Sequence, residues 1–329
     1  KIFVLVKIIF ISLIFILICD YFYSKLYLNQ KLRISHDIFH HTLAASFEGQ
    51  QVWGNKSYKV CTDKSGFKSS CNDILSYEKN FDIAFIGDSF TEAIGLPYEN
   101  SFVGMIANNY PQLKVANLAV TSYSPSIYYS KINWLLNKGY TFKHIYVFVD
   151  ISDIQDESIY SRNQKDIVTK KKFTYEKKKS FAVIKFLKEN FKLSYNLYSN
   201  IKYYFFSPKI TDITKSWVFT WNRSIWTSNF ELTGYGDLGV KKSIDKTLNE
   251  MDQLFKLLEL NKIELSIAVY PWPSQLVEIK NNLDGTNLQT KIWKDFCKNK
   301  CADFIDIFDN YRNLLKYNKV EEIYKEFYI

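Results

Sequence analysis

The sequence predicts an α/β fold in which helices cover a parallel β-sheet. From residue 81 onward, short apolar runs of strand type alternate with segments of helical period. The third of these, residues 144–149, is a continuous apolar run of the type found in buried parallel strands. This alternation implies parallel strands joined by right-handed crossovers. The chain has 329 residues, 47% of them hydrophobic and 17% aromatic, which allows a large core and excludes a disordered protein.

Five strands and five helices are predicted, and no internal repeat is visible. The strands are residues 81–86, 113–118, 144–149, 263–269 and 304–308. The helices are residues 101–109, 126–138, 241–260, 287–298 and 310–326. Gly139 supplies a C-terminal stop for the second helix. Pro271 and Pro273 directly follow the fourth strand, where no ladder N–H is needed.

Residues 161–238 interrupt this alternation and are predicted to be an insertion beside the site. Lysine runs at 170–172 and 177–179 indicate a solvated loop or, alternatively, a patch that contacts a membrane surface. Residues 181–206 follow as an aromatic, amphipathic helix or helix pair. Three tryptophans then lie among polar residues. They are expected either to form part of a lid or of a wall that contacts a sugar ring, or to pack in the core. They are Trp217, Trp221 and Trp226.

The N-terminus is predicted to anchor the chain in a membrane. Residues 2–19 are apolar except for Lys7 and Ser12, which is close to the length of about 20 residues that a membrane-spanning helix needs. Aromatic residues at 21–23 and Tyr27 are typical of a membrane interface. Residues 1–22 are therefore interpreted as an uncleaved signal anchor, with a cleaved signal peptide or a buried core helix as alternatives.

Residues 23–80 are predicted to form a polar, irregular extension that leads into the α/β domain at 81–329. The chain has five cysteines, and four of them form two local pairs, Cys61/Cys71 and Cys297/Cys301. These spacings predict two disulfides in an oxidising compartment, with four reduced thiols as the alternative. A zinc site would need closer ligands and a nearby histidine. The body of the protein is thus expected outside the cytoplasm, in a periplasmic or extracellular location.

The formal net charge of +9 comes mostly from lysine in a chain rich in Ile, Asn, Tyr and Phe. A basic face would attract anionic lipid or acidic glycan. The sequence has no Gly-rich or aromatic RNA-binding motif, so no nucleic-acid partner is predicted. No cofactor and no metal ion are predicted either.

The strongest functional signal is the turn Gly87-Asp88-Ser89, which ends the first strand. In α/β proteins, sites lie at the carboxyl ends of the strands. A serine there has its hydroxyl near free N–H groups of the next helix, which stabilise an oxyanion. Gly87 suits the tight turn, where a side chain would be strained. The alternative is an ordinary turn with a solvated serine.

Residues 86–92, Ile-Gly-Asp-Ser-Phe-Thr-Glu, resemble the Gly-Asp-Ser block of the SGNH/GDSL hydrolases. The resemblance covers residues 81–149 and 263–308, and only the serine block is highly specific. It implies a flavodoxin-like, three-layer fold with Ser89 as the nucleophile and Asp88 shaping the turn. Residues 40–68 are more weakly similar to the lead-in of membrane-anchored, envelope-type members.

The resemblance also implies an oxyanion site, with two departures from the family pattern. Asn117-Leu-Ala119 matches the second block, so the N–H of Ala119 stands where the family prefers glycine. Asp150-Ile-Ser152-Asp153 matches the third block, usually Gly-x-Asn-Asp, so Ser152 replaces the asparagine. Asp150 and Asp153 could equally cap the turn after the strand.

The Asp-x-x-His block that supplies the family's general base is missing. His144 opens the third strand at the opposite edge, and His36 with Asp37 is an upstream alternative. The base is expected beyond residue 329, which makes this chain a fragment; loss of catalysis in evolution is the competing explanation. The predicted function is a serine esterase or O-acyltransferase acting on an envelope ester such as an O-acetylated glycan. The alternatives are a non-catalytic glycan-binding or scaffold protein and an anchored domain without ester chemistry.

Overall fold

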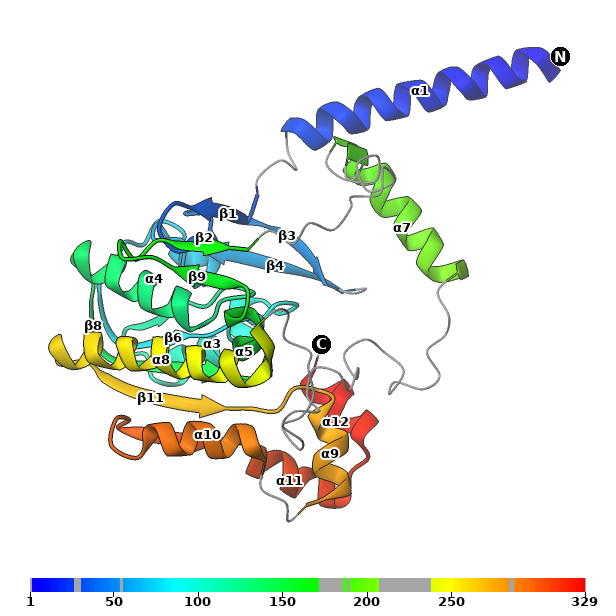
Figure 1. The fold of residues 1–329 in the computed structure, drawn as a ribbon. Helices are drawn as coiled ribbons and strands as arrows, with labels where there is room; N and C mark the ends of the chain where they lie inside the picture. Colours follow the sequence, from blue (N-terminus) through cyan, green and yellow to red (C-terminus); the bar gives the residue numbers. More distant parts are fainter. Residues whose placement is uncertain are drawn as a thin grey trace. The chain divides into compact units, whose positions relative to one another are not determined.

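The computed structural model describes residues 2–26, 31–53, 56–171, 186–187, 190–206, 238–283 and 287–328 (Figure 1). The chain forms two compact units. One unit contains helices α1 (Ile2–Leu26) and α7 (Lys192–Phe206), and the other contains the remaining elements. Residues 32–80 of the predicted extension therefore belong to the same unit as the parallel sheet, and its first residues belong to the unit of α1. The three tryptophans of the insertion and the second lysine run lie outside the described residues.

A five-stranded parallel sheet forms the centre of the larger unit, which confirms the α/β prediction. In spatial order its strands are β12 (Asp303–Asp306), β11 (Glu264–Val269), β8 (Thr141–Val149), β6 (Asn80–Ile86) and β7 (Val115–Asn117). This is the 2-1-3-4-5 order of flavodoxin-like sheets, with the switch point between β6 and β8. The last strand ends two residues earlier than predicted because Asp306 caps the next helix through the Phe308 N–H.

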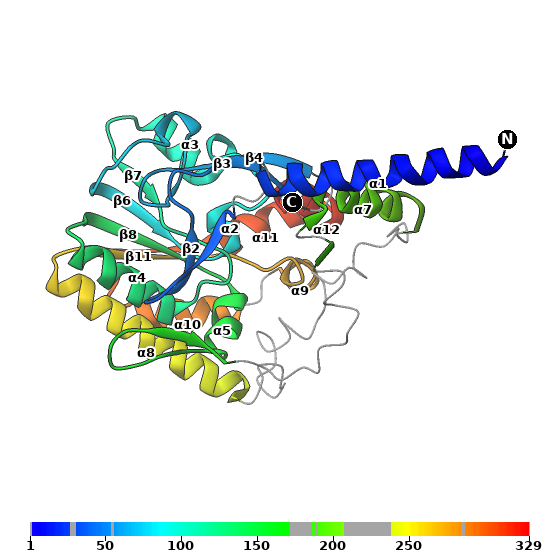
Figure 2. The same cartoon turned by 90° about the horizontal axis from the view of Figure 1, so that it is seen from above.

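Helices cover both faces of this sheet (Figures 1 and 2). Phe102 of α3 (Phe102–Asn109) packs against Phe85 and Phe148 on one face. Helices α4 (Pro125–Asn137) and α8 (Gly239–Leu260) pack against each other over the other. The remaining helices are α2 (Ser89–Glu92), α5 (Ile151–Glu157), α9 (Gln275–Asn281), α10 (Leu288–Cys297), α11 (Ile307–Tyr317) and α12 (Val320–Phe327), with short 3-10 turns at η1 (Cys71–Asp73) and η2 (Tyr98–Asn100). The predicted single helix at 310–326 is wrong, since Asn318 breaks it into α11 and α12.

The prediction that the segment before the sheet is irregular is also wrong. It forms two small antiparallel sheets, β1 (Arg33–His36) with β2 (His40–Leu43), and β3 (Glu48–Trp53) with β4 (Lys56–Thr62) and β5 (Lys68–Ser69). The start of the predicted insertion forms a third hairpin, β9 (Tyr160–Arg162) with β10 (Val168–Lys170). These strands are short and mostly polar, so their composition is that of a loop.

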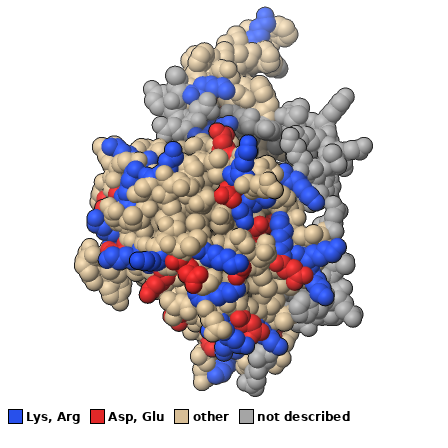
Figure 3. Space-filling model, turned by 60° about the vertical axis from the view of Figure 1, so that its left-hand side comes forward, with Lys and Arg blue, Asp and Glu red and all other residues tan. Residues whose placement is uncertain are grey.

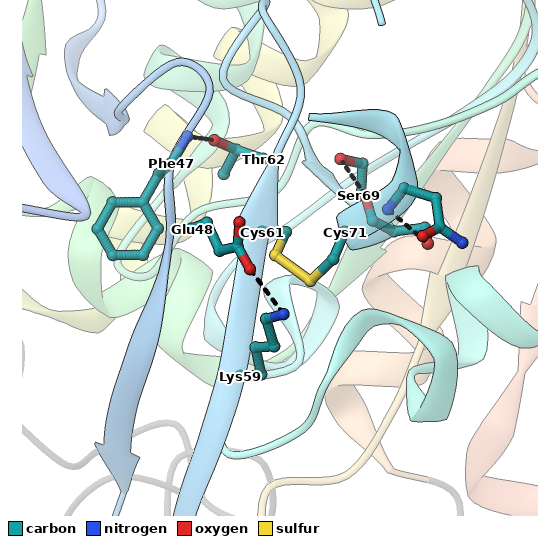
Figure 4. Close-up of a disulfide and its surroundings, with 9 residues drawn as sticks. Phe47, Glu48, Lys59, Cys61, Thr62, Ser69 and Cys71 are labelled. Carbon is teal, nitrogen blue, oxygen red and sulfur yellow. Dashed lines mark hydrogen bonds and ion pairs between the residues drawn. A yellow bond between two sulfur atoms is a disulfide. The ribbon is translucent and has the colours of Figure 1, made fainter. Parts of the chain in front are cut away.

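Both predicted disulfides are present. Cys61–Cys71 joins β4 to η1, beside the Glu48–Lys59 ion pair and the hydrogen bond from the Phe47 N–H to Thr62 (Figure 4). Cys297–Cys301 closes the end of α10. Cys19 on α1 is a free, exposed thiol.

Among the described helices, α1 alone contains a segment long and apolar enough to cross a membrane, Val6–Lys25. Its apolar side chains are largely exposed, for example Phe10 and Phe15. The sequence prediction of an N-terminal apolar helix is therefore confirmed, and its length and composition fit an anchor.

Basic and acidic side chains are interspersed over the face shown in Figure 3. Ion pairs between basic and acidic side chains of the described residues include Lys114–Glu78 and Lys300–Asp252.

Candidate active site

Ser89 lies at the carboxyl edge of the sheet, directly after β6. Strand β6 ends at Ile86 and α2 begins at Ser89, with Asp88 as the N-cap whose Oδ1 accepts the Phe90 N–H at 2.9 Å. A Cβ on Gly87 would lie 2.3 Å from Thr91 Oγ1 and 2.9 Å from the Phe148 carbonyl oxygen. Glycine is therefore required as predicted, and the reason is the close approach of these atoms.

The carboxylate of Asp88 gathers hydroxyl groups from three strand ends. Ser89 Oγ donates to Asp88 Oδ2 at 3.4 Å, and Ser152 Oγ donates to the same oxygen at 3.0 Å. Tyr270, which directly follows β11, donates its hydroxyl to Oδ1 at 2.9 Å. Asp88 is buried, whereas Ser89 and Ser152 are partly exposed. The arrangement brings the hydroxyls of two partly exposed serines to one buried acceptor.

Burial and hydrogen bonding shift the pKa of the Asp88 carboxyl in opposite directions. Burial raises the pKa of Asp88, while hydrogen bonds from Phe90 N–H, Tyr270, Ser152 and Ser89 lower it. Burial has the larger effect, so the pKa of Asp88 lies above its ordinary value. Asp88 therefore holds its proton more readily than a solvated aspartate, and it accepts hydrogen bonds best at higher pH.

Asp150 and Asp153 cap α5, as the alternative to a catalytic role had anticipated. Asp150 accepts the Ser152 N–H, and Asp153 Oδ2 accepts the Asp150 N–H at 2.7 Å. The Tyr128 hydroxyl donates to Asp153 Oδ1. Both carboxyls are fully buried, and burial followed by the neighbouring carboxyls raises the pKa of each well above its ordinary value. Asp150 Oδ2 has no hydrogen-bond partner among the described residues.

Replacing Asp150 with asparagine is expected to stabilise the protein at pH 8. Because the folded pKa of Asp150 is raised, the folded state binds this proton more tightly than the unfolded chain, and stability is lost as pH rises above the ordinary aspartate range. Asparagine caps equally well and carries no charge. We expect Asp150→Asn to raise the free energy of unfolding by about 1–3 kcal/mol at pH 8 and to leave it nearly unchanged at pH 4, measured by urea denaturation.

Asp82→Asn is the matched control, because its expected pH dependence has the opposite sign. The Asp82 side chain is partly exposed, and hydrogen bonds from the Lys114 N–H and Lys143 lower its pKa. Its stabilising contribution is present above the ordinary aspartate pKa and is lost as pH falls. Asp82→Asn should therefore weaken the fold at pH 8 only. If Asp150→Asn weakens the fold at pH 8, as Asp82→Asn is expected to do, the raised pKa of the buried Asp150 carboxyl is contradicted.

The predicted oxyanion role of Ala119 is not supported by the geometry. Its N–H donates to Asn117 Oδ1 at 3.1 Å, and the Asn117 amide donates to the Thr91 carbonyl at 2.9 Å. Asn117 and Ala119 are both buried, so they hold the β7 end against α2. The Ser152 hydroxyl is likewise committed to Asp88. In contrast, no hydrogen bond of the Ser89 N–H is present within the described residues.

No histidine hydrogen-bonds to Ser89 in the part of the chain that the structure describes. His36 Nδ1 is close to the N–H groups of Ile38 and Phe39, and the ring stacks on Phe39. Burial lowers the pKa of His36. His144 lies within β8 rather than at its start, and pairs with Ser266 at 2.8 Å. The upstream alternative of His36 with Asp37 as general base therefore receives no support.

Two basic residues from the small N-terminal sheets brace the serine's helix, and sequence reasoning missed both. Lys68 Nζ donates to the carbonyls of Glu92, Ala93 and Leu96 at 2.9, 2.8 and 2.7 Å. Arg33 forms an ion pair with the buried Glu92. Since these carbonyls lie at and just beyond the C-terminal end of the four-residue α2, Lys68 fixes the end of the helix that carries Ser89.

Aromatic residues beside Ser89 were also missed. Phe90 contacts Tyr270, Trp272 and Tyr328 with ring-centroid distances of 5.3, 5.6 and 5.7 Å. The signal for Tyr270 was present, since it directly follows an apolar strand at the same edge as Ser89. An apolar cluster of rings therefore lies beside the polar groups of the site.

No protein-family model and no curated protein matches this chain. Function is therefore inferred from the site itself.

Proposed function

We propose that the protein is a serine esterase or O-acyltransferase of the SGNH type, with Ser89 as its nucleophile. One observation carries the proposal: a partly exposed serine hydroxyl at the switch point of a 2-1-3-4-5 sheet, hydrogen-bonded to a buried carboxyl. Sites of doubly wound proteins lie at this crevice. The resemblance of residues 86–92 to the Gly-Asp-Ser block supports the same assignment.

The expected chemistry is formation and breakdown of an acyl-serine. Ser89 Oγ attacks the ester carbonyl carbon and loses its proton to a base, and the ester alcohol leaves with a proton. Water or a sugar hydroxyl then takes the acyl group from Ser89. The unpaired N–H of Ser89 is available to the developing oxyanion. Asp88 orients the Ser89 and Ser152 hydroxyls through one shared oxygen.

An ester of the cell envelope is the substrate class we propose. The two disulfides fit an oxidising compartment, and α1 fits a membrane anchor. Phe90, which follows the serine in the chain and is half-buried, is an aromatic residue of a type that contacts sugar rings or acyl groups, and it packs on the buried Tyr270 and Trp272. An O-acetylated glycan combines both features.

Covalent labelling tests the proposal directly. The full-length protein, treated with a fluorophosphonate probe, is expected to be labelled at Ser89, because such probes trap activated serines. Peptide mass spectrometry locates the adduct, and Ser152→Ala serves as a control that keeps Ser89. Labelling at Ser152, or no labelling above that of the denatured protein, would contradict the assignment.

A non-catalytic glycan-binding or scaffold protein is the second candidate. The observation that favours it is that no described histidine reaches Ser89. In that case, an O-acetylated oligosaccharide should bind with equal affinity to the wild type and to Ser89→Ala, and remain intact. Isothermal titration followed by analysis of the released acetate separates the two candidates.

A further inference from the structure

Helix α1 holds the N-terminus of α7, and both belong to the smaller unit. Asp20 Oδ1 accepts the Leu193 N–H at 3.1 Å, and Asp20 Oδ2 accepts the Ser194 N–H at 2.7 Å. Ser24 Oγ accepts the Lys192 N–H at 2.9 Å. A helix leaves its first four N–H groups without intrahelical partners. Side chains of α1 therefore satisfy three donors at the start of α7.

These contacts explain why an apolar segment carries an aspartate near its end. Asp20 and Ser24 are the buried polar residues of α1, and Ser24 Oγ also donates to Asp20 Oδ1 at 2.9 Å. A carboxylate near a membrane is costly unless it is paired, and the positive end of α7 supplies the pairing. The adjacent Tyr21 and Tyr23 are typical of a membrane interface. Helix α7 thus begins at the level of the interface.

One face of α7 carries an apolar stripe that nothing in its unit covers among the described residues. Leu193, Leu197 and Ile201 are spaced four residues apart and so share a face. Their exposed fractions are 49%, 62% and 47%. A surface helix of a globular domain normally turns such a stripe into the core. Asn196 is exposed on the flank of this stripe.

We propose that the Leu193–Leu197–Ile201 stripe of α7 lies in the surface of the bilayer that holds α1, with the helix parallel to the membrane plane. Amphipathic helices bind at this depth through an apolar face and flanking basic residues. Lys192 at the start of α7 supplies such a charge. The bilayer is favoured over a protein partner because the same helix end is bonded to α1, so the stripe starts where the lipid begins. The proposal does not depend on the chemistry at Ser89.

Spin-label accessibility tests this placement. In a Cys19→Ser background, the full-length protein carries a nitroxide at Leu197→Cys or, as the matched control, at Asn196→Cys, in vesicles of phosphatidylcholine and phosphatidylglycerol. Oxygen partitions into lipid and a charged nickel chelate into water. We expect the oxygen-to-nickel accessibility ratio to be several-fold higher for the label at 197 than for the label at 196.

Equal ratios at the two positions would overturn the proposal, because the stripe would then face water. Shielding of the label at 197 from both reagents would also overturn it, since another protein surface would then cover the stripe. Asp20→Ala tests the attachment: its expected effect is to abolish the difference between the two labels while the protein resists alkaline extraction from the vesicles. An unchanged difference would show that α1 does not position α7.

Discussion

Ser89→Ala is expected to lower the rate of p-nitrophenyl acetate hydrolysis by the full-length protein by about 10³-fold or more, since removal of a catalytic nucleophile leaves only binding and oxyanion effects. Ser89 directly follows the strand next to the switch point, and its hydroxyl is the proposed attacking group. Stability should change little, because Ser89 Oγ makes a single hydrogen bond of 3.4 Å. Initial rates and thermal unfolding, measured on the same preparations, check both parts.

Ser152→Ala is the matched control for this experiment. Its hydroxyl donates to the same Asp88 oxygen as that of Ser89, at 3.0 Å. Loss of one such hydrogen bond is expected to lower the rate by about tenfold or less, since a net hydrogen bond contributes roughly 0.5–1.5 kcal/mol. Equal rates for the wild type and Ser89→Ala would exclude the acyl-serine and favour the binding function. A larger loss for Ser152→Ala than for Ser89→Ala would reassign the nucleophile.

Lys68→Met is expected to lower the free energy of unfolding by about 2 kcal/mol or more, because three carbonyls, two of them in buried contacts, lose the lysine as a donor and an unsatisfied buried group costs roughly 1–3 kcal/mol. Methionine keeps the length of the side chain and its burial. The loss should also displace α2 and so reduce fluorophosphonate labelling of Ser89. Urea denaturation and labelling of the variant under native conditions measure the two effects.

The loss of stability caused by Lys68→Met is expected to increase with pH. Burial lowers the pKa of Lys68 to about 8. Between this value and the ordinary lysine pKa, the folded state binds fewer protons than the unfolded chain, so the contribution of Lys68 to stability rises with pH. The difference between wild type and Lys68→Met should therefore be larger at pH 10 than at pH 7. Lys79→Met is the control, because Lys79 Nζ donates to a single carbonyl, that of Lys138, at an exposed position. An equal loss in the two variants would contradict the role of Lys68.

The sheet could be predicted from the sequence because the segments that form its strands are rich in apolar residues. Ile145, Val147 and Val149 are fully buried in β8. An apolar run of this kind can be recognised as a buried strand without knowing which strands lie beside it. The position of Ser89 followed, since the carboxyl ends of parallel strands share one edge. The strands before the sheet were missed because β3 and β5 are short and polar, so only their pairing partners define them.

The details of the site depended on contacts that the sequence does not display. Lys68 reaches carbonyls 24, 25 and 28 residues away. The hydrogen bond from the Ala119 N–H to Asn117 could have been predicted from the sequence, because an asparagine side chain often accepts the N–H of the residue two positions later. Comparison with a family pattern emphasised the missing glycine at Ala119 and overlooked this local turn.

The bond between Cys61 and Cys71 encloses Lys68 within its ten-residue span. The amine that secures the serine's helix is therefore set in place by a crosslink that forms only under oxidising conditions. We infer that the surroundings of Ser89 reach their final order only after this bond has formed: while the thiols remain reduced, β5 is held less firmly and Ser89 is less well ordered. Labelling of Ser89 before and after mild reduction would measure this dependence, and equal labelling would refute it.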